Sequence, residues 1–302
     1  MKIDFYVEKR IKDCKSLWNE FSKNEYLTDN WEYRLCFHNA YKNTPYFIVG
    51  KTKGEIIGFV PLEYDEKRKS YIFFGGADWN EQMRFLIKDL YKHQYLHTFI
   101  QQLPHQASLR FIHPEDARFI KEGVIKEEDF SYYLVPKDYD FDMETYLTTF
   151  SPRSRKNIRK ALRRIGKLNF KIRKGRIKDF DRLINFNIQR YKKDSMFMDD
   201  RFTLAIKNLL MSKTSKFIIT LVTVLIDNQV EAISLFAEYK RGLVYLEGSS
   251  DPSQSDVSRF LDYHIFEHAF KKKLDYIDAL SGDCGWKERW RLKKKTLFKL
   301  TT

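Results

Sequence analysis

The pattern of hydrophobic and polar positions changes period repeatedly along the chain. Short segments alternate apolar and polar residues, which is typical of strands, whereas longer segments repeat apolar residues every three or four positions, which is typical of helices. In the first half this pattern predicts a strand, two helices, three strands, a helix and a further strand. The expected ranges are 3–7 for the first strand, helices around 17–21 and 31–40, strands at 46–50, 56–63 and 71–75, a helix at about 80–93, and a strand at 98–103.

The second half repeats this order of elements. A strand, two helices, three strands, a helix and a strand are expected at 168–172, 179–191, 200–211, 217–226, 230–239, 243–248, 256–270 and 276–280. Such repetition is best explained by duplication of one α/β domain with mixed sheets. We therefore expect two domains, at 1–140 and 141–302; the alternative is two unrelated domains whose element orders agree by chance.

A strongly basic segment opens the second domain. Residues 151–178 hold thirteen Lys or Arg residues and no Asp or Glu. Its first part is predicted to be a helix, because Ser151 can cap the first turn, Pro152 suits the first helical position, and Gly166 can end the helix in a left-handed conformation. Like charges four residues apart repel, which favours an anionic partner over a role in solubility alone. Nucleotide phosphates, tRNA, lipid headgroups and DNA all remain open as that partner.

Composition restricts the class of protein. The 302 residues carry a formal net charge of +14, and 43% of them are hydrophobic, which excludes a disordered chain. Three widely spaced cysteines indicate neither a disulfide framework nor a zinc site, and they fit a reducing cytoplasm. His264 and His268 lack an evident third ligand, so no metal is expected. The longest apolar run, 217–226, is far below the roughly 20 residues of a membrane helix, although the basic face could contact an anionic membrane.

Three stretches give the sequence a family resemblance. They are GEIIGFVPLEY at 54–64, SPRSRKNIRKALRRIGKLNFKI at 151–172, and the segment 249–290, which ends in GDCGWKERW. In order and spacing they resemble the double-GNAT, FemAB-like acyltransferases, including the cellulose-biosynthesis CelD-type proteins. The resemblance implies two tandem GNAT-like domains. It also implies transfer of an acyl or aminoacyl group, from acyl-CoA (acetyl-CoA) or aminoacyl-tRNA, to a primary amine of a cell-envelope or surface-polysaccharide precursor.

One segment departs from the pattern of that family. GNAT domains typically bind the pyrophosphate of CoA with a glycine-rich turn before a helix, whereas residues 251–259 here read DPSQSDVSR. Backbone amides are therefore a poor candidate for holding the phosphates, and side-chain cations are expected to replace them. The residues predicted to bind the cofactor are Arg155, Lys156, Arg159, Arg163 and Arg259.

Acyl transfer to an amine requires a base for the amine proton and positive charge for the developing oxyanion. Asp283 and Lys287 follow the last predicted strand and are the leading catalytic pair; the resemblance places Lys287 near the transferred acyl group. Glu247, at the end of a predicted strand, is the further catalytic candidate. The residues predicted to bind the amine substrate are Asp78, Tyr245 and Trp286.

A function of a different class is also compatible with the sequence. The basic segment could bind nucleic acid or an anionic surface on a GNAT-like scaffold that has no catalytic activity. Binding to several nucleic-acid phosphates would weaken steeply with salt, whereas an enzyme would lose turnover when its catalytic residues are replaced.

Overall fold

The computed structural model describes residues 2–76, 79–121, 123–282 and 285–302. The chain forms two compact units. Unit 1 comprises Met1–Ser131, Leu204–Leu209 and Lys295–Thr302, and unit 2 comprises Tyr132–Thr203 and Leu210–Lys294. Both units combine helices with sheets, and the sheet of unit 2 mixes parallel and antiparallel pairs, so the expected fold class is confirmed. None of the helices in these described ranges has both the length and the apolar character needed to cross a membrane.

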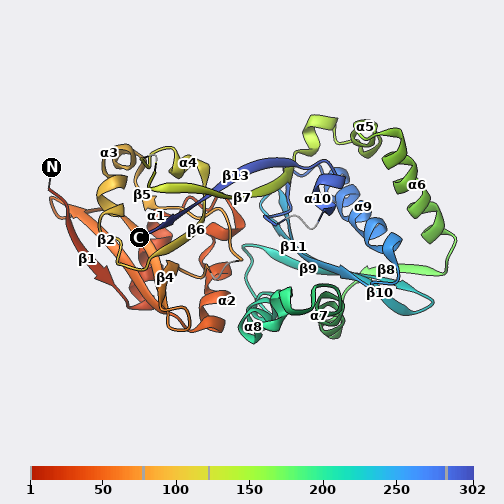
Figure 1. Ribbon diagram of the computed structural model, residues 1–302, viewed down its shortest axis with the longest axis horizontal. Coiled ribbons are helices and arrows are strands. Elements are labelled where there is room, and N and C mark those ends of the chain that lie inside the picture. The colour runs from red at the N-terminus through yellow and green to blue at the C-terminus, as the bar shows by residue number, and fades with distance from the viewer. Residues whose placement is uncertain (1, 77–78, 122, 283–284) are drawn as a thin grey trace. The chain divides into compact units, whose positions relative to one another are not determined.

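Unit 1 is built mainly from the first half of the chain (Figure 1). Its elements are β1 (Asp4–Glu8), α1 (Ile11–Phe21), η1 (Leu27–Asp29), α2 (Trp31–Tyr41), β2 (Thr44–Thr52), β3 (Glu55–Asp65), β4 (Ser70–Phe73), β5 (Leu86–Ile87), α3 (Asp89–Ile100), β6 (Ser108–Ile112), α4 (Pro114–Ala117) and the start of β7 (Ile125–Leu134). Strands β1 to β4 pair in chain order, all antiparallel, and β5 adds to β3. A parallel bridge joins Ala107, the residue before β6, to Tyr71 of β4.

Unit 2 contains the sheet on which the site is built. Its elements are η2 (Pro136–Tyr139), α5 (Met143–Thr148), α6 (Pro152–Gly166), β8 (Phe170–Lys174), α7 (Ile177–Tyr191), η3 (Lys192–Asp194), η4 (Met196–Met198), part of α8 (Asp200–Leu210), β9 (Ile218–Ile226), β10 (Gln229–Tyr239), β11 (Gly242–Ser250), α9 (Ser255–Lys271), β12 (Tyr276–Asp278), α10 (Trp286–Arg289) and the start of β13 (Lys293–Thr301). Strands β8 to β11 are antiparallel neighbours, and β11 then pairs with β12 in parallel. In Figure 1, α6 and α9 cover one face of this sheet and α7 covers the other.

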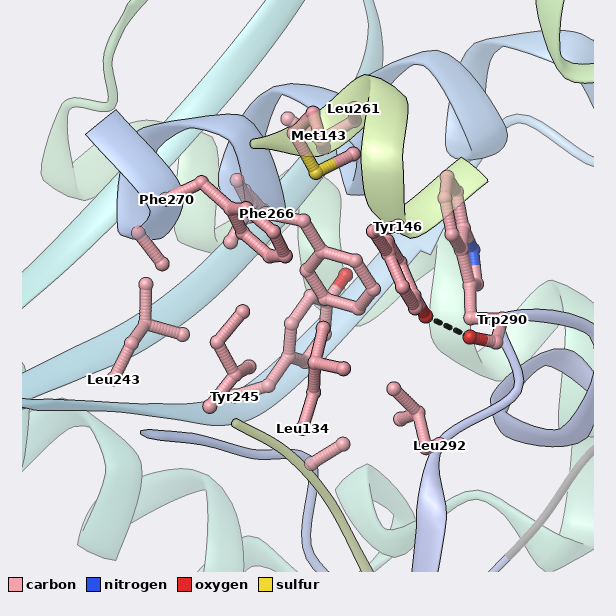
Figure 2. Close-up of a cluster of buried hydrophobic side chains, with 14 of the residues drawn as sticks. Leu134, Met143, Tyr146, Leu243, Tyr245, Leu261, Phe266, Phe270, Trp290 and Leu292 are labelled. Atoms are coloured by element: carbon pink, nitrogen blue, oxygen red, sulfur yellow. Dashed lines mark hydrogen bonds between the residues drawn. The ribbon is translucent and has the colours of Figure 1, made fainter. Parts of the chain in front are cut away.

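The core of unit 2 lies between the sheet and the helices α5, α6 and α9. Figure 2 shows its aromatic centre, where Tyr146, Phe266 and Trp290 meet. The hydroxyl of Tyr146 donates a hydrogen bond to the carbonyl oxygen of Trp290. This bond anchors Trp290, the residue that follows α10, to the core, and α10 is the helix that carries Lys287.

Each unit includes a strand segment that comes from the other half of the chain: the end of β7 belongs to unit 2, and the end of β13 belongs to unit 1. At the end of β7, Leu134 pairs with Ile277 of β12 in unit 2. At the end of the chain, Leu300 of β13 pairs with Leu109 of β6 in unit 1. Leu297 and Leu300 are fully buried there among the side chains of the unit 1 core.

The region around 80–103 corrects the sequence prediction. The expected helix at 80–93 is wrong, because residues 80–85 are irregular, β5 follows, and the helix is Asp89–Ile100. Gln82 has a φ of 58°, which a right-handed helix cannot accommodate. The expected strand at 98–103 is also wrong, since it covers the end of α3, and the strand is β6.

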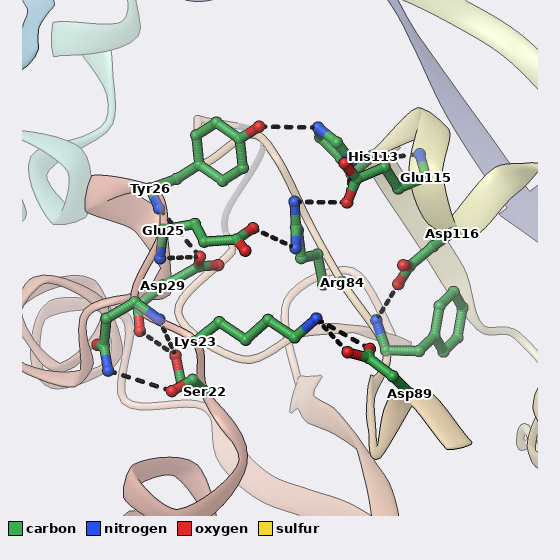
Figure 3. Close-up of polar contacts among 12 residues, drawn as sticks. Ser22, Lys23, Glu25, Tyr26, Asp29, Arg84, Asp89, His113, Glu115 and Asp116 are labelled. Carbon is green, nitrogen blue, oxygen red and sulfur yellow. Dashed lines mark hydrogen bonds and ion pairs between the residues drawn. The ribbon is translucent and has the colours of Figure 1, made fainter. Parts of the chain in front are cut away.

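Buried polar contacts hold this irregular segment in place (Figure 3). The Arg84 guanidinium pairs with Glu25 at 2.8 Å and with Glu115 at 3.1 Å. The backbone amide of Phe85 donates to the Asp116 carboxylate at 2.7 Å. The bond to Asp116 satisfies a backbone amide that a helix would satisfy internally, and the two pairs of Arg84 join the loop before η1 to α4.

Helix α6 begins and ends where the sequence predicts. The Ser151 hydroxyl accepts a hydrogen bond from the amide of Ser154 at 3.2 Å, and Pro152 is the first helical residue. Gly166 is the last helical residue, but the expected left-handed conformation is absent there, because the positive φ values of the described residues do not include Gly166. Ile158, Ala161 and Ile165 are buried on one side, which leaves the cations on the other.

We predict that replacing Leu297 with Ala destabilises unit 1, although Leu297 lies near the end of the chain. Loss of a fully buried leucine typically costs about 2–5 kcal/mol of unfolding free energy. Chemical denaturation and hydrogen exchange at the β6 amides measure the effect. Lys299→Ala, at an exposed position of the same strand, should change the free energy by less than about 0.5 kcal/mol. Equal effects of the two substitutions would contradict this account of β13.

Candidate active site

The site forms where two parallel strands stop pairing. β11 pairs with β12 only at Gly242, Leu243 and Val244, yet β11 continues to Ser250. Its pairing with β10 is also interrupted: Tyr245 pairs with Phe236 and Glu247 with Leu235, so Leu246 is a bulged residue. A bulge bends a strand and changes the direction of the side chains next to it. The second half of β11 therefore presents an edge and redirected side chains at the centre of the sheet.

The bulge sends Tyr245 and Glu247 to opposite faces. In a regular strand, residues two apart lie on the same face. Here the hydroxyl of Tyr245 donates to the Asp262 carboxylate on α9 at 2.9 Å, whereas Glu247 accepts from the Asn187 amide on α7 at 3.3 Å. Gly248 follows, and a Cβ at that position would lie only 2.4 Å from the Tyr245 hydroxyl oxygen. Position 248 must therefore be a glycine, because any side chain there would collide with the Tyr245 hydroxyl group.

Glu247 is the group best suited to move a proton near neutral pH. Its side chain is half-buried, and burial raises its pKa to about 8. A hydrogen bond from the Gly248 amide, at 3.3 Å, and the positive charge of Lys287 both act in the opposite direction and stabilise the charged form. A carboxylate with a pKa in this range can accept a proton efficiently as a general base.

Lys287 is buried at the start of α10, with 4% of its surface exposed. Its ammonium group donates to the carbonyl oxygens of Leu280, at 3.0 Å, and Ser281. Leu280 is buried and has a φ of 59°, a left-handed conformation that costs energy for a bulky residue. Lys287 therefore holds the turn after β12 in a strained shape, and it also supplies the positive charge that acts on Glu247.

Aromatic rings lie around Lys287. The ammonium nitrogen is 5.3 Å from the ring centre of Tyr132 and 5.8 Å from that of Trp286. The rings of Trp286 and Tyr245 are themselves 5.1 Å apart. Of the residues predicted for the site, Glu247, Lys287, Tyr245 and Trp286 are thus linked by contacts or by electrostatic interaction within unit 2. Asp283 and Asp78 lie outside the described residues.

Two polar residues of this region were missed by the sequence analysis. Asp262 lies fully within the core, accepts from Tyr245 and from the Trp290 indole at 3.3 Å, and has its pKa raised to about 6 by burial. Asn187 is buried on α7 next to Phe186. Each is a polar residue inside an apolar helical stripe, and that interruption is the signal that could have revealed them.

The cations of α6 line a separate open hollow of about 740 Å³. Its lining residues are Pro152, Arg155, Lys156, Arg159, Leu162 and Arg163. Arg159 pairs with the exposed Glu144 at 2.6 Å, so part of the positive charge is balanced from α5. Among the described residues that line the hollow, none is acidic, so the lining itself is electropositive.

The turn before α9 engages its own polar groups. The Asp251 carboxylate accepts from the amide of Ser253 at 2.8 Å and from its hydroxyl at 2.7 Å. At the start of α9, Asp256 pairs with Arg259 at 3.2 Å and with Arg164 at 3.0 Å. Carboxylates therefore occupy donors that phosphates would need in a pyrophosphate-binding turn.

Within the described ranges, no group of three or more His, Cys, Asp or Glu side chains is arranged to hold a metal ion. Residues 152–288 match the family model described as Acetyltransferase (GNAT) domain. No curated protein is similar enough in sequence to count as a match.

Solved structures share the fold over the full length of the chain. FemX has a TM-score of 0.60 at 11% identity, covering 100% of this chain and 98% of FemX. A tandem GNAT protein from the clavulanic acid biosynthesis pathway has a TM-score of 0.59 at 6% identity, covering 99% and 98%. A conserved protein of unknown function from Bacteroides thetaiotaomicron VPI-5482 has a TM-score of 0.60 at 8% identity, covering 99% and 100%. The second half of the chain thus matches the GNAT acetyltransferase domain family over residues 152–288, and the chain as a whole shares the fold of FemX and of the clavulanic acid pathway protein.

Proposed function

We propose that this enzyme transfers an acyl or aminoacyl group to a primary amine with Glu247 as the general base. The observation that carries the proposal is a carboxylate with a pKa raised to about 8, placed on β11 just beyond the end of its pairing with β12. A primary amine must lose a proton as it attacks a carbonyl carbon, and a base whose pKa lies near the working pH is the most effective acceptor.

The donor supplies an activated acyl carbonyl, and residues of this chain provide the proton transfer and the positioning. Glu247 takes the proton from the attacking nitrogen as the carbon–nitrogen bond forms and the bond to the leaving group breaks. Lys287 keeps the turn after β12 in place and contributes positive charge next to Glu247. We infer that the edge of β11 beyond Val244, which β12 leaves uncovered, offers backbone amides to the acyl group.

We propose that Trp286 lines the amine site, and that Tyr245, which lies on the opposite face of β11 from Glu247, supports the Trp286 ring. Their rings are in contact, and aromatic faces attract ammonium groups and the apolar parts of amino sugars. Asp78 and Asp283 remain predictions for the substrate site and the catalytic site. The acceptor we propose is an amine of a cell-envelope or surface-polysaccharide precursor, and the compartment is the cytoplasm, in keeping with the free, buried Cys14 and Cys36.

The donor we propose is acyl-CoA or aminoacyl-tRNA, with its phosphates held by α6. The electropositive hollow of Arg155, Lys156, Arg159 and Arg163 supports this assignment, because the turn before α9 has its own carboxylates on the available donors. Arg259 pairs with Asp256, so it could bind a donor phosphate only after giving up that ion pair. The clavulanic acid pathway protein is described in a form without AcCoA, which supports including an acyl-CoA among the donors to be tested.

Turnover should depend on Glu247 and on pH. With acetyl-CoA and glucosamine, or with aminoacyl-tRNA, we expect kcat/KM to rise with pH through about 8 and to level above it, because the base must be deprotonated. Glu247→Gln should lower kcat/KM by roughly 10²–10⁴-fold. The circular dichroism spectrum of the variant should match that of the wild type. Undiminished turnover in this variant would refute the assigned base.

The same carboxyl group should make stability depend on pH. Its pKa is about 8 in the folded chain against 4.5 for the ordinary carboxyl, so the folded state holds the proton more tightly between these values. The contribution of this group to stability is therefore fully present below pH 4.5 and is lost as pH rises through about 8. Glu247→Gln removes this loss, and we expect its melting temperature to exceed the wild-type value above pH 8 and to match it at pH 4. Glu66→Gln, an exposed control, should have the wild-type melting temperature both at pH 4 and above pH 8. If the melting temperature of Glu247→Gln differed from the wild-type value by the same amount at every pH, the raised pKa would be contradicted.

The cations of α6 should determine donor affinity. We expect the triple variant Arg155→Gln, Arg159→Gln, Arg163→Gln to weaken binding of the donor at least tenfold, measured by calorimetry with acetyl-CoA and by fluorescence anisotropy with tRNA. Arg153→Gln, on the same helix but outside the hollow, is the matched control. For tRNA, log affinity should fall steeply with log salt in the wild type and less steeply in the triple variant. Wild-type affinity of the triple variant for both ligands would remove α6 from the site.

The α6 hollow also keeps a second function open, that of a basic protein binding nucleic acid or an anionic surface without catalysis. Its electropositive, open form is the observation in favour. Steeply salt-dependent tRNA binding without turnover, in a protein whose Glu247→Gln variant behaves identically, would support this alternative.

A further inference from the structure

We propose that Asn187 and Ser195 form a positioning relay for Glu247, in which the α7 side of unit 2 directs one carboxylate oxygen and leaves the other free for the amine. The proposal rests on the general-base function of Glu247 and adds the residues that orient it. Neither residue was predicted from the sequence, and both lie about 50 to 60 positions away from Glu247 in the chain.

The relay begins at η4. The Ser195 hydroxyl oxygen accepts the amide hydrogen of Phe197 at 3.2 Å, which caps this short helix. The hydroxyl hydrogen is then donated to the side-chain carbonyl oxygen of Asn187 at 2.6 Å. Ser195 and Asn187 are 5% and 4% exposed, so water does not compete effectively for this bond.

The Ser195 contact fixes which way the Asn187 amide points. Because the carbonyl oxygen of Asn187 receives the hydroxyl, its NH2 group must face the other direction. There it donates to Oε2 of Glu247 at 3.3 Å. The amide of Gly248 donates to the same oxygen at 3.3 Å. Two N–H groups from different elements thus hold Oε2.

The second oxygen of Glu247, Oε1, accepts no hydrogen bond from the residues of the described ranges. A carboxylate anchored through one oxygen presents the lone pairs of the other in a fixed direction. Such anchoring is what a general base needs, because proton transfer requires the acceptor within hydrogen-bond reach of the reacting nitrogen. The free oxygen is therefore assigned to the amine proton.

The charged and titratable neighbours of Glu247 come from the other elements around it. Lys287 of α10 faces it with a positive charge, and Tyr245 on its own strand is neutral and bonded to Asp262. From α7 the group that reaches it is Asn187, which is uncharged. Replacing this donor by a carboxyl group would place a second acid next to Glu247, and two such acids cannot easily ionise together.

The test measures the titration of Glu247 directly, so it needs no knowledge of the acceptor. In full-length protein labelled with ¹³C at the glutamate side-chain carboxyl carbons, the Glu247 resonance is assigned by its absence in Glu247→Gln. We expect Asn187→Asp to move its midpoint upwards by at least one pH unit, and Asn187→Leu and Ser195→Ala to move it upwards by smaller amounts. Asn208→Asp is the matched control, because the Asn208 amide donates to a backbone carbonyl of unit 1 at 3.3 Å; it should leave the midpoint unchanged.

The outcomes separate the relay from the function on which it rests. An unshifted midpoint in Asn187→Asp, in protein that remains folded, would overturn the relay even if Glu247→Gln is inactive. Full turnover of Glu247→Gln with acetyl-CoA or aminoacyl-tRNA would instead overturn the general base. If both the general base and the relay are correct, the pH midpoint of kcat/KM in Asn187→Asp should shift by the same number of pH units as the titration midpoint of the Glu247 resonance. Loss of packing alone would not produce that shift.

Discussion

The end of the parallel pairing between β11 and β12 is the constraint on which the site depends. Three residue pairs hold the strands together, and after Val244 and Asp278 they separate. Had the pairing continued, the backbone of β11 would be occupied and no edge would remain at the centre of the sheet. The separation is stabilised from the β12 side, where Lys287 holds the left-handed turn at Leu280, and from the β10 side, where the bulge at Leu246 bends β11.

The electrostatics of unit 2 follow from that geometry. Glu247 reaches a half-buried position because the bulge turns it away from the α9 core, and burial then raises its pKa. Lys287 is buried but supplied with two carbonyl acceptors, which compensates its lost hydration. Opposite charges in this setting keep the carboxyl group near the range where it exchanges protons, instead of leaving it permanently neutral. The contacts of Lys287 thus account both for the strained backbone at Leu280 and for part of the electrostatic environment of Glu247.

Local signals explain what the sequence could predict. Helix α6 was predicted closely because Ser151 and Pro152 act on neighbouring backbone groups and its apolar stripe is regular. The prediction of a helix at 80–93 failed because Met83, Leu86 and Ile87 repeat at helical spacing although they are buried in an irregular segment and a short strand. Leu90, which continues that spacing, is 82% exposed. There the long-range pairs of Arg84 with Glu25 and Glu115 prevail over local preference. Glu247 and Lys287 could be proposed as candidates from their places at the end of one predicted strand and after another, but the bulge and Asn187 depend on contacts between distant segments.

The exchange of final strands has a consequence for how the protein is made. Unit 1 contains the first 131 residues, yet Leu297 and Leu300 also belong to its core. During synthesis, domains generally fold in order as they leave the ribosome, but this core stays incomplete until residues 297–300 have emerged. Unit 2 likewise needs the end of β7, which is synthesised early and must wait for β12. The apolar side chains of unit 1 that pack against Leu297 and Leu300 therefore lack these native partners until that part of the chain has been synthesised.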